Sequence, residues 1–351
     1  MKKRKIVILS EGATDPTSAK TASGVIRYRQ DEVVALIDST KAGRDASEIF
    51  GIGQGIPIVA TFQETLVFQP DLLLVGISPA GGQLPPLWRQ IILKAIENGL
   101  DIVSGLHHFL VDDPEFVISA EKFQVQLTDL RRVPSDLTVN KCLAKSQKCL
   151  RIHTVGTDCN VGKKVVCLEI THRLQHTGKD AVFVATGQTG IFIAGRGIAL
   201  DRVIADFVAG AAERLVLENA DHDYLLIEGQ GALVHPLYSG VTLSMLHGFA
   251  PQALIIVHEY GRNIMRGSKD TPVLPPETLI PLYEEIARPV FPTKVIGVAL
   301  NLRRLDDQQA RQMIAEVERN TGLPTTDVIK FGADKLVTAI LDYEKQLKSA
   351  L

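Results

Sequence analysis

Cysteine is scarce in this chain, and the shortage excludes two kinds of protein. The 351 residues include 4 cysteines, too few for a disulfide framework in a chain of this length. None of the four stands at the two-residue spacing of a zinc or redox motif. The sequence therefore favours a reduced protein, and we expect a cytoplasmic location.

Basic excess and long apolar runs are also absent. The chain has 38 Lys+Arg against 40 Asp+Glu, so no surplus of positive charge is available for a phosphate backbone and we expect no nucleic-acid partner. The longest apolar runs, such as Leu72 to Val75 and Leu254 to Val257, fall far short of the roughly 20 residues of a membrane span. After the charged start, only Ile6 to Leu9 are apolar, which is too short for a secretory signal. We therefore expect no membrane association.

Length and apolar content indicate two globular domains. At about 150 residues per domain the chain predicts two, and 45% hydrophobic residues suffice for a core in each. Short β-branched runs alternate with amphipathic helical patterns, which is typical of α/β proteins with a mostly parallel sheet. We expect the boundary in the polar stretch 140–148, between a Rossmann-like domain at 1–145 and a second domain at 146–351.

The expected elements follow this alternation. In the N-terminal half we expect strands at 5–9, 33–37, 72–77 and 101–103, and a helix at 85–98. In the C-terminal half we expect strands at 151–155, 181–185, 224–227, 253–257 and 294–300, with helices at 163–176, from Asp201 as N-cap to Leu215, at 306–320 and after Gly332. The loop after the strand at 151–155 thus leads directly into a helix.

That loop carries the most specific motif of the sequence. Its residues, all candidates for ligand binding, are Gly156, Thr157, Asp158, Cys159, Asn160, Val161, Gly162, Lys163 and Lys164. Glycines let the backbone aim successive N–H groups at an anion, and the helix start adds the positive end of its dipole. Two adjacent lysines at a helix start are unfavourable without an anion, so a ligand-free turn is the weaker interpretation. We expect a di- or triphosphate ligand.

The loop departs in two ways from that of nucleotide triphosphatases, and the second departure favours coenzyme A as the ligand. Five residues separate Gly156 from Gly162, a spacing that resembles the loop of dethiobiotin synthetase and its relatives. Lys164 stands where a triphosphatase has the Ser or Thr that binds magnesium, and two lysines can neutralise a metal-free pyrophosphate directly. ATP used for phosphoryl transfer normally needs the metal. ATP with magnesium held by Asp158 or Glu228 is the alternative.

Two further residues are candidate bases beyond the strand at 224–227, where ligands bind in parallel α/β sheets. Glu228 precedes the glycines of 229–231, and it could coordinate a metal or accept a proton. His235 is the second candidate. The competing interpretations are that Glu228 caps a neighbouring helix and that His235 is a satisfied core histidine.

Two other segments are candidates to bind substrate. Gln188 lies in the segment 186–190, which could surround an acyl or carboxylate group with backbone donors. Arg262 and Arg266 are four apart, so a turn of helix at 263–266 would place both guanidinium groups on one face, suited to a dicarboxylate. The competing interpretation is that both arginines are solvated surface charges.

The N-terminal half has weaker signals. No Gly-x-Gly-x-x-Gly follows its first strand, so nicotinamide binding is weakly supported. Asp38 ends the second strand, where an acid that binds ribose would lie, and the segment 76–82 could border a cleft. Both patterns are also typical of ordinary turns.

Six segments carry a resemblance to a known family: 20–28, 74–82, 156–164, 227–231, 299–301 and 325–334. Together they resemble the two-domain bacterial proteins described as D-glutamate N-acetyltransferase-like, formerly a domain of unknown function. The resemblance covers essentially the whole chain. It implies a Rossmann-like N-terminal domain, a P-loop C-terminal domain, and acetyl transfer from acetyl-coenzyme A to the amine of D-glutamate.

The leading hypothesis is an acetyl-coenzyme A-dependent N-acetyltransferase acting on an acidic amino acid. In it the P-loop binds the pyrophosphate, Arg262 and Arg266 bind the acceptor, and Glu228 or His235 takes the proton. The preference for the D-form rests on the resemblance alone. The alternatives are an ATP- and magnesium-dependent ligase or kinase similar to dethiobiotin synthetase, and a nucleotide-binding regulator. The expected partner is a small amino-acid substrate, and a homo-oligomer is compatible with the sequence.

Overall fold

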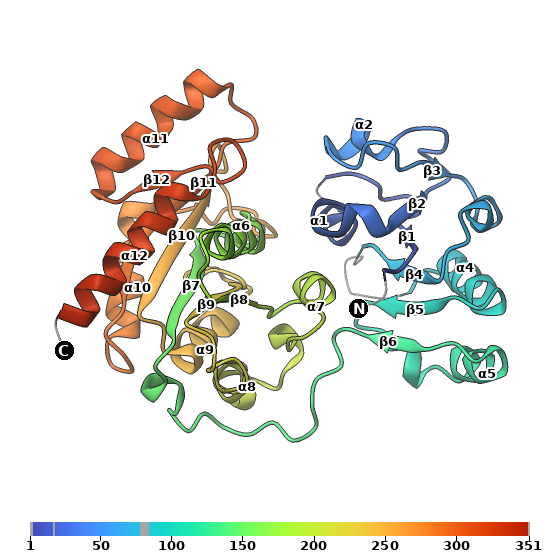
Figure 1. The fold of residues 1–351 in the computed structure, drawn as a ribbon, viewed down its shortest axis with the longest axis horizontal. Helices are drawn as coiled ribbons and strands as arrows, with labels where there is room; N and C mark the ends of the chain where they lie inside the picture. The colour runs from blue at the N-terminus through green and yellow to red at the C-terminus, as the bar shows by residue number, and fades with distance from the viewer. Residues whose placement is uncertain (1–2, 17, 78–83, 350–351) are drawn as a thin grey trace. The chain divides into compact units, whose positions relative to one another are not determined.

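The chain folds into two compact α/β units (Figure 1). The structure is a computed structural model that describes residues 3–16, 18–77 and 84–349. One unit comprises Met1–Arg132 and Ile191–Ala199, and the other comprises Val133–Gly190 and Leu200–Leu351. Each contains a sheet of six strands whose pairings are all parallel. The expected α/β class with two mostly parallel sheets is confirmed.

The first unit has the strand order β3-β2-β1-β4-β5-β6, the Rossmann order. Its strands are β1 (Ile6–Leu9), β2 (Val33–Ile37), β3 (Ile58–Val59), β4 (Leu72–Val75), β5 (Asp101–Ser104) and β6 (Leu127–Asp129). Its helices are α1 (Lys20–Arg29), α2 (Ala46–Phe50), α3 (Phe62–Thr65), α4 (Pro86–Glu97) and α5 (Pro114–Phe123). The expectation missed β3 and β6, because strands of 2 and 3 residues are too short to show a period.

The second unit has the strand order β12-β11-β10-β7-β9-β8. Its strands are β7 (Leu150–Gly156), β8 (Ala181–Val184), β9 (Tyr224–Ile227), β10 (Ala253–Glu259), β11 (Lys294–Asn301) and β12 (Thr325–Thr326). Its helices are α6 (Lys163–His176), α8 (Ala205–Leu217), α9 (Ser239–Phe249), α10 (Pro276–Ala287), α11 (Asp307–Thr321) and α12 (Asp334–Ser349), and the division between the units falls within α7 (Gln188–Ala194). Every residue of β7 is buried, and β7 pairs with β10 and β9.

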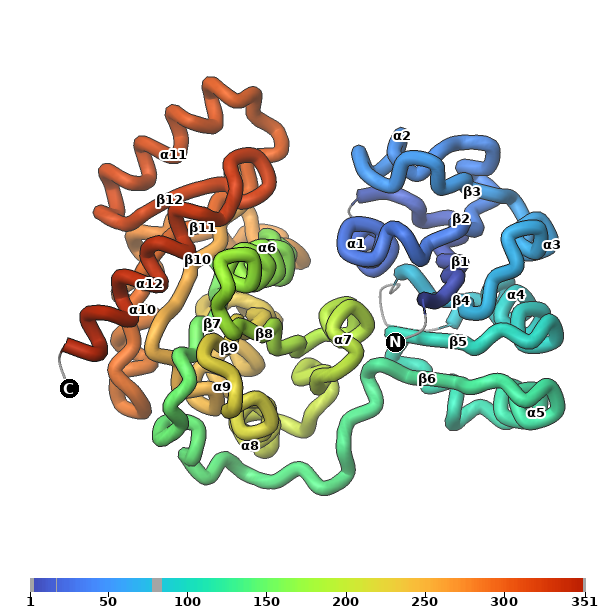
Figure 2. The backbone as a smooth tube through the Cα atoms, in the orientation of Figure 1, coloured from blue at the N-terminus to red at the C-terminus, as the bar shows by residue number. Residues whose placement is uncertain are grey.

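Most predicted elements are confirmed, and the differences have local causes. The helix expected from Asp201 begins later, at Ala205 with Ile204 as N-cap, because Leu200–Arg202 forms a separate 3₁₀ turn. Strand β12 and seven helices were not expected: α1, α2, α3, α5, α7, α9 and α10. Pro281 lies inside α10, where proline normally indicates a break. Between β6 and β7 the chain follows a long segment whose described helical content is one 3₁₀ turn, Ala144–Ser146 (Figure 2). No helix within the described ranges is long and apolar enough to cross a membrane.

Candidate functional site

The candidate site lies at the carboxyl edge of the second sheet. Because its strands are parallel, their carboxyl ends meet at one edge, where ligands bind in such folds. The loop 157–162 leaves the central strand β7 at this edge. Glu228 follows β9, Glu259 ends β10 and Asn301 ends β11. The edge therefore gathers residues that are far apart in the sequence.

The carbonyl oxygens of the loop are held by side chains. The hydrogen bonds run from Tyr283 Oη to Gly156 O (2.8 Å), Lys163 Nζ to Asp158 O (2.8 Å), Arg262 Nη1 to Cys159 O (2.7 Å), Arg262 Nη2 to Asn160 O (3.4 Å) and Asn301 Nδ2 to Val161 O (3.3 Å). These donors come from α6, α10 and the ends of β10 and β11. They fix the direction of successive peptide groups in the loop.

The N–H groups at the end of the loop and at the start of α6 are left without acceptors, whereas Thr157 N donates to Val257 O and Cys159 N to Asp158 Oδ1. From residue 160 to residue 165, no backbone N–H donates to any acceptor within the described parts of the chain. Gly162, the N-cap of α6, has a φ of 119°, a conformation that only glycine adopts readily. Because the first N–H groups of a helix have no partners inside it, they need one from outside. An anion is the partner that this concentration of donors favours.

Two lysines add positive charge at the same place. Lys163 is 6% exposed, and its Nζ also donates to Gly231 O at 2.7 Å. Lys164 is half-buried, and its Nζ makes no hydrogen bond in the part of the chain that the structure describes. Burial lowers the pKa of both ammonium groups to about 8, although the nearby carboxylate of Glu228 opposes the shift. A bound anion would relieve the cost of burying these charges.

Asp158 is a buried carboxylate that organises the loop. It accepts hydrogen bonds from Cys159 N (2.6 Å), Arg262 Nη1 (2.8 Å) and Arg266 N (3.0 Å). Burial raises its pKa, but these hydrogen bonds and the charge of Arg262 outweigh burial and lower the pKa below its ordinary value. Asp158 is therefore ionised and already paired with protein donors.

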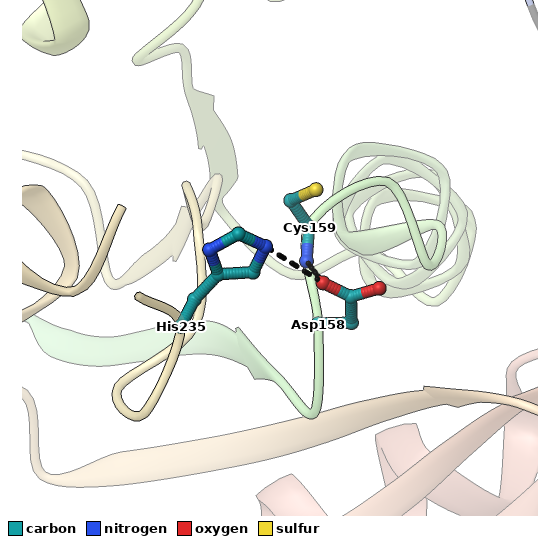
Figure 3. A group of neighbouring side chains, drawn as sticks. All are labelled: Asp158, Cys159 and His235. Atoms are coloured by element: carbon teal, nitrogen blue, oxygen red, sulfur yellow. Dashed lines mark hydrogen bonds and ion pairs between the residues drawn. The ribbon is translucent and has the colours of Figure 1, made fainter. Parts of the chain in front are cut away.

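His235 joins Asp158 and Cys159 in a group whose potential ligand atoms lie within 4.8 Å of one another (Figure 3). His235 Nδ1 accepts from Leu237 N at 3.1 Å, so its proton belongs on Nε2. Nε2 faces Asp158 Oδ1 at 3.2 Å and Arg266 O at 3.1 Å, and both are acceptors. In Figure 3 the sulfur of Cys159 points away from the carboxylate. The arrangement fits a hydrogen-bonded brace better than a set of metal ligands.

Glu228 has a different environment. It is 4% exposed, and its Oε2 accepts from Thr186 N (3.0 Å) and Gly187 N (3.2 Å), just before α7. Burial raises its pKa, although the charge of Lys164 and the two backbone N–H groups oppose that shift. Oε1 has no hydrogen bond in the described part of the chain. A Cβ on Gly190 would collide with Oε2, so α7 approaches the carboxylate closely only because glycine stands there.

The expected pairing of Arg262 and Arg266 is not seen. Residues 263–266 form no helical turn, because Met265 N donates to Thr271 O and Val273 N donates to Asn263 O, which pairs the segment with 271–273. The guanidinium of Arg262 donates hydrogen bonds to Asp158, to Glu259 and to two loop carbonyls. The side chain of Arg266 is exposed. The two guanidinium groups therefore have different surroundings and do not lie together on one helical face.

The remaining predicted groups fall as follows. Gln188 is the first residue of α7 and is half-buried. The N–H of Gly187 donates to Glu228 and that of Gly229 donates to Thr154 Oγ1 at 3.0 Å, so neither is free to bind an acyl or carboxylate group. The catalytic, substrate-binding and phosphate-binding roles expected from the sequence stay predictions.

Sequence reasoning missed the residues that hold the loop from a distance. Tyr283 lies in the unexpected helix α10, where its hydroxyl also accepts from Leu233 N at 3.0 Å. Glu259 is 3% exposed and binds Arg262 and Arg303. Only Asn301 had a signal, as part of the segment 299–301 that carries the family resemblance. None of the others belongs to a local motif.

In the first unit, Asp38 is fully buried. It accepts from Thr14 N (3.0 Å), Thr40 N (2.9 Å) and Thr40 Oγ1 (2.7 Å). Its carboxylate is thus occupied by protein groups rather than presented to a ribose. Residues 78–82 of the segment expected to border a cleft lie outside the described residues.

Comparison with known proteins connects this geometry to a family. Residues 39–133 match the Rossmann-like domain, and residues 138–337 the P-loop domain, of a family described as a domain of unknown function, DUF1611. Among solved structures, a DUF1611 family protein from Anabaena variabilis is similar with a TM-score of 0.92 and 37% identity, covering 97% of this chain and 99% of that one. Both expected domain types are thereby confirmed.

Two curated relatives carry a functional name. A D-glutamate N-acetyltransferase from Tritonibacter scottomollicae is 37% identical over 93% of this chain and 96% of its own length. Another with the same name, from a Pseudoalteromonas species, is 38% identical over 93% of this chain and 95% of its own length. The chain therefore belongs to the DUF1611 family of two-domain, D-glutamate N-acetyltransferase-like proteins.

Proposed function

We propose that this protein is an N-acetyltransferase that transfers the acetyl group of acetyl-coenzyme A to the amine of an acidic amino acid. Similarity along 93% of the chain to relatives named D-glutamate N-acetyltransferase supports the reaction type and the acceptor. The observation that carries the choice of donor is the loop 157–162, whose carbonyls are hydrogen-bonded to side chains, with unpaired N–H groups from residue 160 onward and two lysines beside them. In this proposal the loop binds the pyrophosphate of coenzyme A.

The state of Asp158 supports a ligand bound without metal. Lys164 occupies the position where a magnesium-binding loop has a hydroxyl. Asp158 already accepts three hydrogen bonds, from Cys159 N, Arg262 Nη1 and Arg266 N, and His235 Nε2 lies 3.2 Å from its Oδ1. A cation at this carboxylate would have to displace them. Two lysines and a row of N–H groups can neutralise a pyrophosphate without such a displacement.

Glu228 is the base in this proposal. Oε1 of its carboxylate makes no hydrogen bond in the described part of the chain. Burial raises the pKa of Glu228 toward neutral pH, where a general base is most effective. The neutral amine attacks the thioester carbon, a C–N bond forms, and the C–S bond breaks as coenzyme A leaves. Glu228 takes the proton that the attacking nitrogen loses. His235, with both ring nitrogens engaged, acts as a positioning residue for Asp158.

Arg266 is the acceptor-binding arginine in this proposal. Its backbone N–H is tied to Asp158, which places it beside the loop, while its side chain is exposed. Arg262 is the weaker candidate because its guanidinium is already committed to the loop. A carboxylate of the amino acid can pair with Arg266 in a charge-assisted hydrogen bond.

The test is acetyl transfer followed by release of free thiol. We expect turnover with D-glutamate and slower turnover with alanine or lysine as acceptors. Glu228→Gln should lower kcat by about 10²- to 10⁴-fold, the usual contribution of a general base, while leaving the Kd of coenzyme A within a few-fold of wild type. Arg266→Ala should raise the acceptor KM, and Lys269→Ala, which removes an exposed charge from the same loop, should not.

Three outcomes would contradict this assignment. Stabilisation by ATP with magnesium, and not by acetyl-coenzyme A, would support the ligase or kinase alternative. Normal kcat in the Glu228 variant would remove the proposed base. Equal rates with alanine and glutamate would remove the acidic acceptor while leaving acetyl transfer in place.

A further inference from the structure

The carboxyl edge of the second sheet has two chemically different sides. The strand β7, which carries the loop, has β10, β11 and β12 on one side and β9 and β8 on the other. The side of β9 and β8 presents Glu228 and the start of α7. The side of β10 and β11 presents arginines. A long ligand that is anchored at the loop by its pyrophosphate would therefore meet different charges at its two ends.

The arginines are arranged around one buried carboxylate. Glu259, at the end of β10, pairs with Arg262, with Arg303 Nη2 at 2.9 Å and with Arg304 Nη2 at 4.0 Å. Arg262 faces the loop and holds two of its carbonyls. Arg303 and Arg304 follow the end of β11, and their side chains are 46% and 64% exposed. Three guanidinium groups surround Glu259 and one of them also pairs with Asp158, so these two carboxylates leave one positive charge unbalanced on the solvent side.

The position of this charge matches one feature of coenzyme A. Arg262 pairs with both Asp158 and Glu259, and it also hydrogen-bonds the loop. Arg303 and Arg304 contact the same Glu259, so they lie next to Arg262 on the side away from the loop. Asn301, two residues before Arg303, itself donates to Val161 O. In coenzyme A the 3′-phosphate is one ribose ring away from the pyrophosphate. A phosphate group is the anion that exposed guanidinium groups bind best.

We propose that Arg303 and Arg304 bind the 3′-phosphate of coenzyme A and so select it over nucleotides that lack this group. This inference rests on the proposed function, and it fixes the orientation of the donor. The adenosine end lies on the β10–β11 side, and the pantetheine arm with its thioester extends toward Glu228. The reverse orientation would bring the 3′-phosphate toward the carboxylate of Glu228, which repels it.

The test compares coenzyme A with dephospho-coenzyme A, which differs only by the 3′-phosphate. Calorimetry on the full chain at fixed ionic strength should show that wild type binds coenzyme A about tenfold to a hundredfold more tightly, the range for one charge-assisted contact. Arg304→Ala should remove most of this preference by weakening coenzyme A alone. Arg304 is the better first target because Glu259 still pairs with Arg262 and Arg303 when the Arg304 side chain is removed. The double variant of Arg303 and Arg304 should bind both ligands equally.

Arg319→Ala is the matched control. It removes the same charge from an exposed position in the last turn of α11, about 18 Å along that helix from its start near Arg304. We expect it to keep the preference for coenzyme A. Equal binding of the two ligands by wild type, or an unchanged preference in the double variant, would overturn this inference and leave acetyl transfer standing. Failure of wild type to bind either ligand would overturn the proposed function itself.

Discussion

The loop after β1 in the first unit and the loop after β7 in the second occupy the same topological position, between a buried parallel strand and a helix. In the first, the N–H groups of Gly12 and Thr14 donate to the carboxylate of Asp38, and Ala13 N donates to Ser10 O. In the second, the N–H groups from residue 160 to residue 165 have no acceptor within the described residues. A carboxylate of the protein thus accepts from the N–H groups of the first loop, and none accepts from the N–H groups of 160–165 in the second.

This difference in the hydrogen bonding of the N–H groups distinguishes two loops at the same position of the same architecture. Asp38 directly follows the neighbouring strand β2, and its carboxylate accepts from the N–H groups that would otherwise be open to a ligand. Beside β7, the corresponding carboxylate is Asp158, but it turns to Arg262, His235 and Arg266 N instead of to the unpaired N–H groups. Two adjacent lysines, Lys163 and Lys164, then stand at the start of α6. We therefore expect ligand binding from the second loop and stability from the first.

The largest effect should come from Lys163→Ala. The variant loses a buried charge-assisted contact to the phosphates worth about 1.5–3 kcal/mol, so the Kd of acetyl-coenzyme A should rise about tenfold to a hundredfold in calorimetry. Lys163 also holds the carbonyls of Asp158 and Gly231, so circular dichroism should accompany the measurement. An unchanged Kd in a folded variant would mean that the loop has no phosphate ligand.

The second prediction concerns the self-contained loop. Asp38→Ala leaves the N–H group of the buried Thr14 and that of the exposed Gly12 without their acceptor, which should lower the free energy of unfolding by about 1–3 kcal/mol. Hydrogen bonds from Thr14 and Thr40 outweigh burial and lower the pKa of Asp38, so its contribution is present above the pKa of an unfolded aspartate and is lost as pH falls through the lower, folded value. Denaturant unfolding at neutral and acidic pH measures both.

The Kd of acetyl-coenzyme A serves as the control for Asp38→Ala. It should stay at the wild-type value, because Asp38 belongs to the first unit. A large change in this Kd would show that the two loops do not act separately.

A smaller effect is expected from Lys164→Thr, which restores the hydroxyl of a magnesium-binding loop. Loss of one partly buried charge should weaken acetyl-coenzyme A about tenfold, and ATP binding should become dependent on magnesium. Thermal shift with each ligand, with and without the metal, measures the change. A variant that behaves as wild type would remove the argument that the second lysine replaces a metal.

The smallest effect is the dependence on pH. Burial lowers the pKa of Lys163 and Lys164 to about 8, so the affinity for acetyl-coenzyme A should fall as pH rises through that value. At about pH 8.5 roughly a quarter of each lysine stays protonated, which costs about fourfold for each lysine that the ligand needs charged. Binding should then take up protons from the buffer. Lys164→Arg, whose charge persists, should show a weaker dependence, and a flat wild-type profile would contradict the shifted pKa values.

Local patterns predicted much of the fold. Helix α6 begins at Lys163 and ends at His176 as expected, because the glycine before it and the apolar spacing within it are properties of neighbouring residues. Helix α11 has the expected N-cap at Asp306 and the expected Gly322 as its C-cap. The helical turn expected at 263–266 failed because backbone pairing with 271–273, which no spacing rule describes, determines the conformation of that segment.

The sequence by itself determined the two α/β domains, the loop between β7 and α6 and the two lysines at the start of that helix. Only the tertiary structure decided which way the loop faces. Its carbonyls are tied by Tyr283, Asn301 and Arg262, which lie 127, 140 and 103 residues from their partners. Such contacts form only when parallel strands bring their carboxyl ends to one edge. For the same reason, Arg262 proved to be a brace for the loop, although its spacing from Arg266 had suggested a substrate clamp.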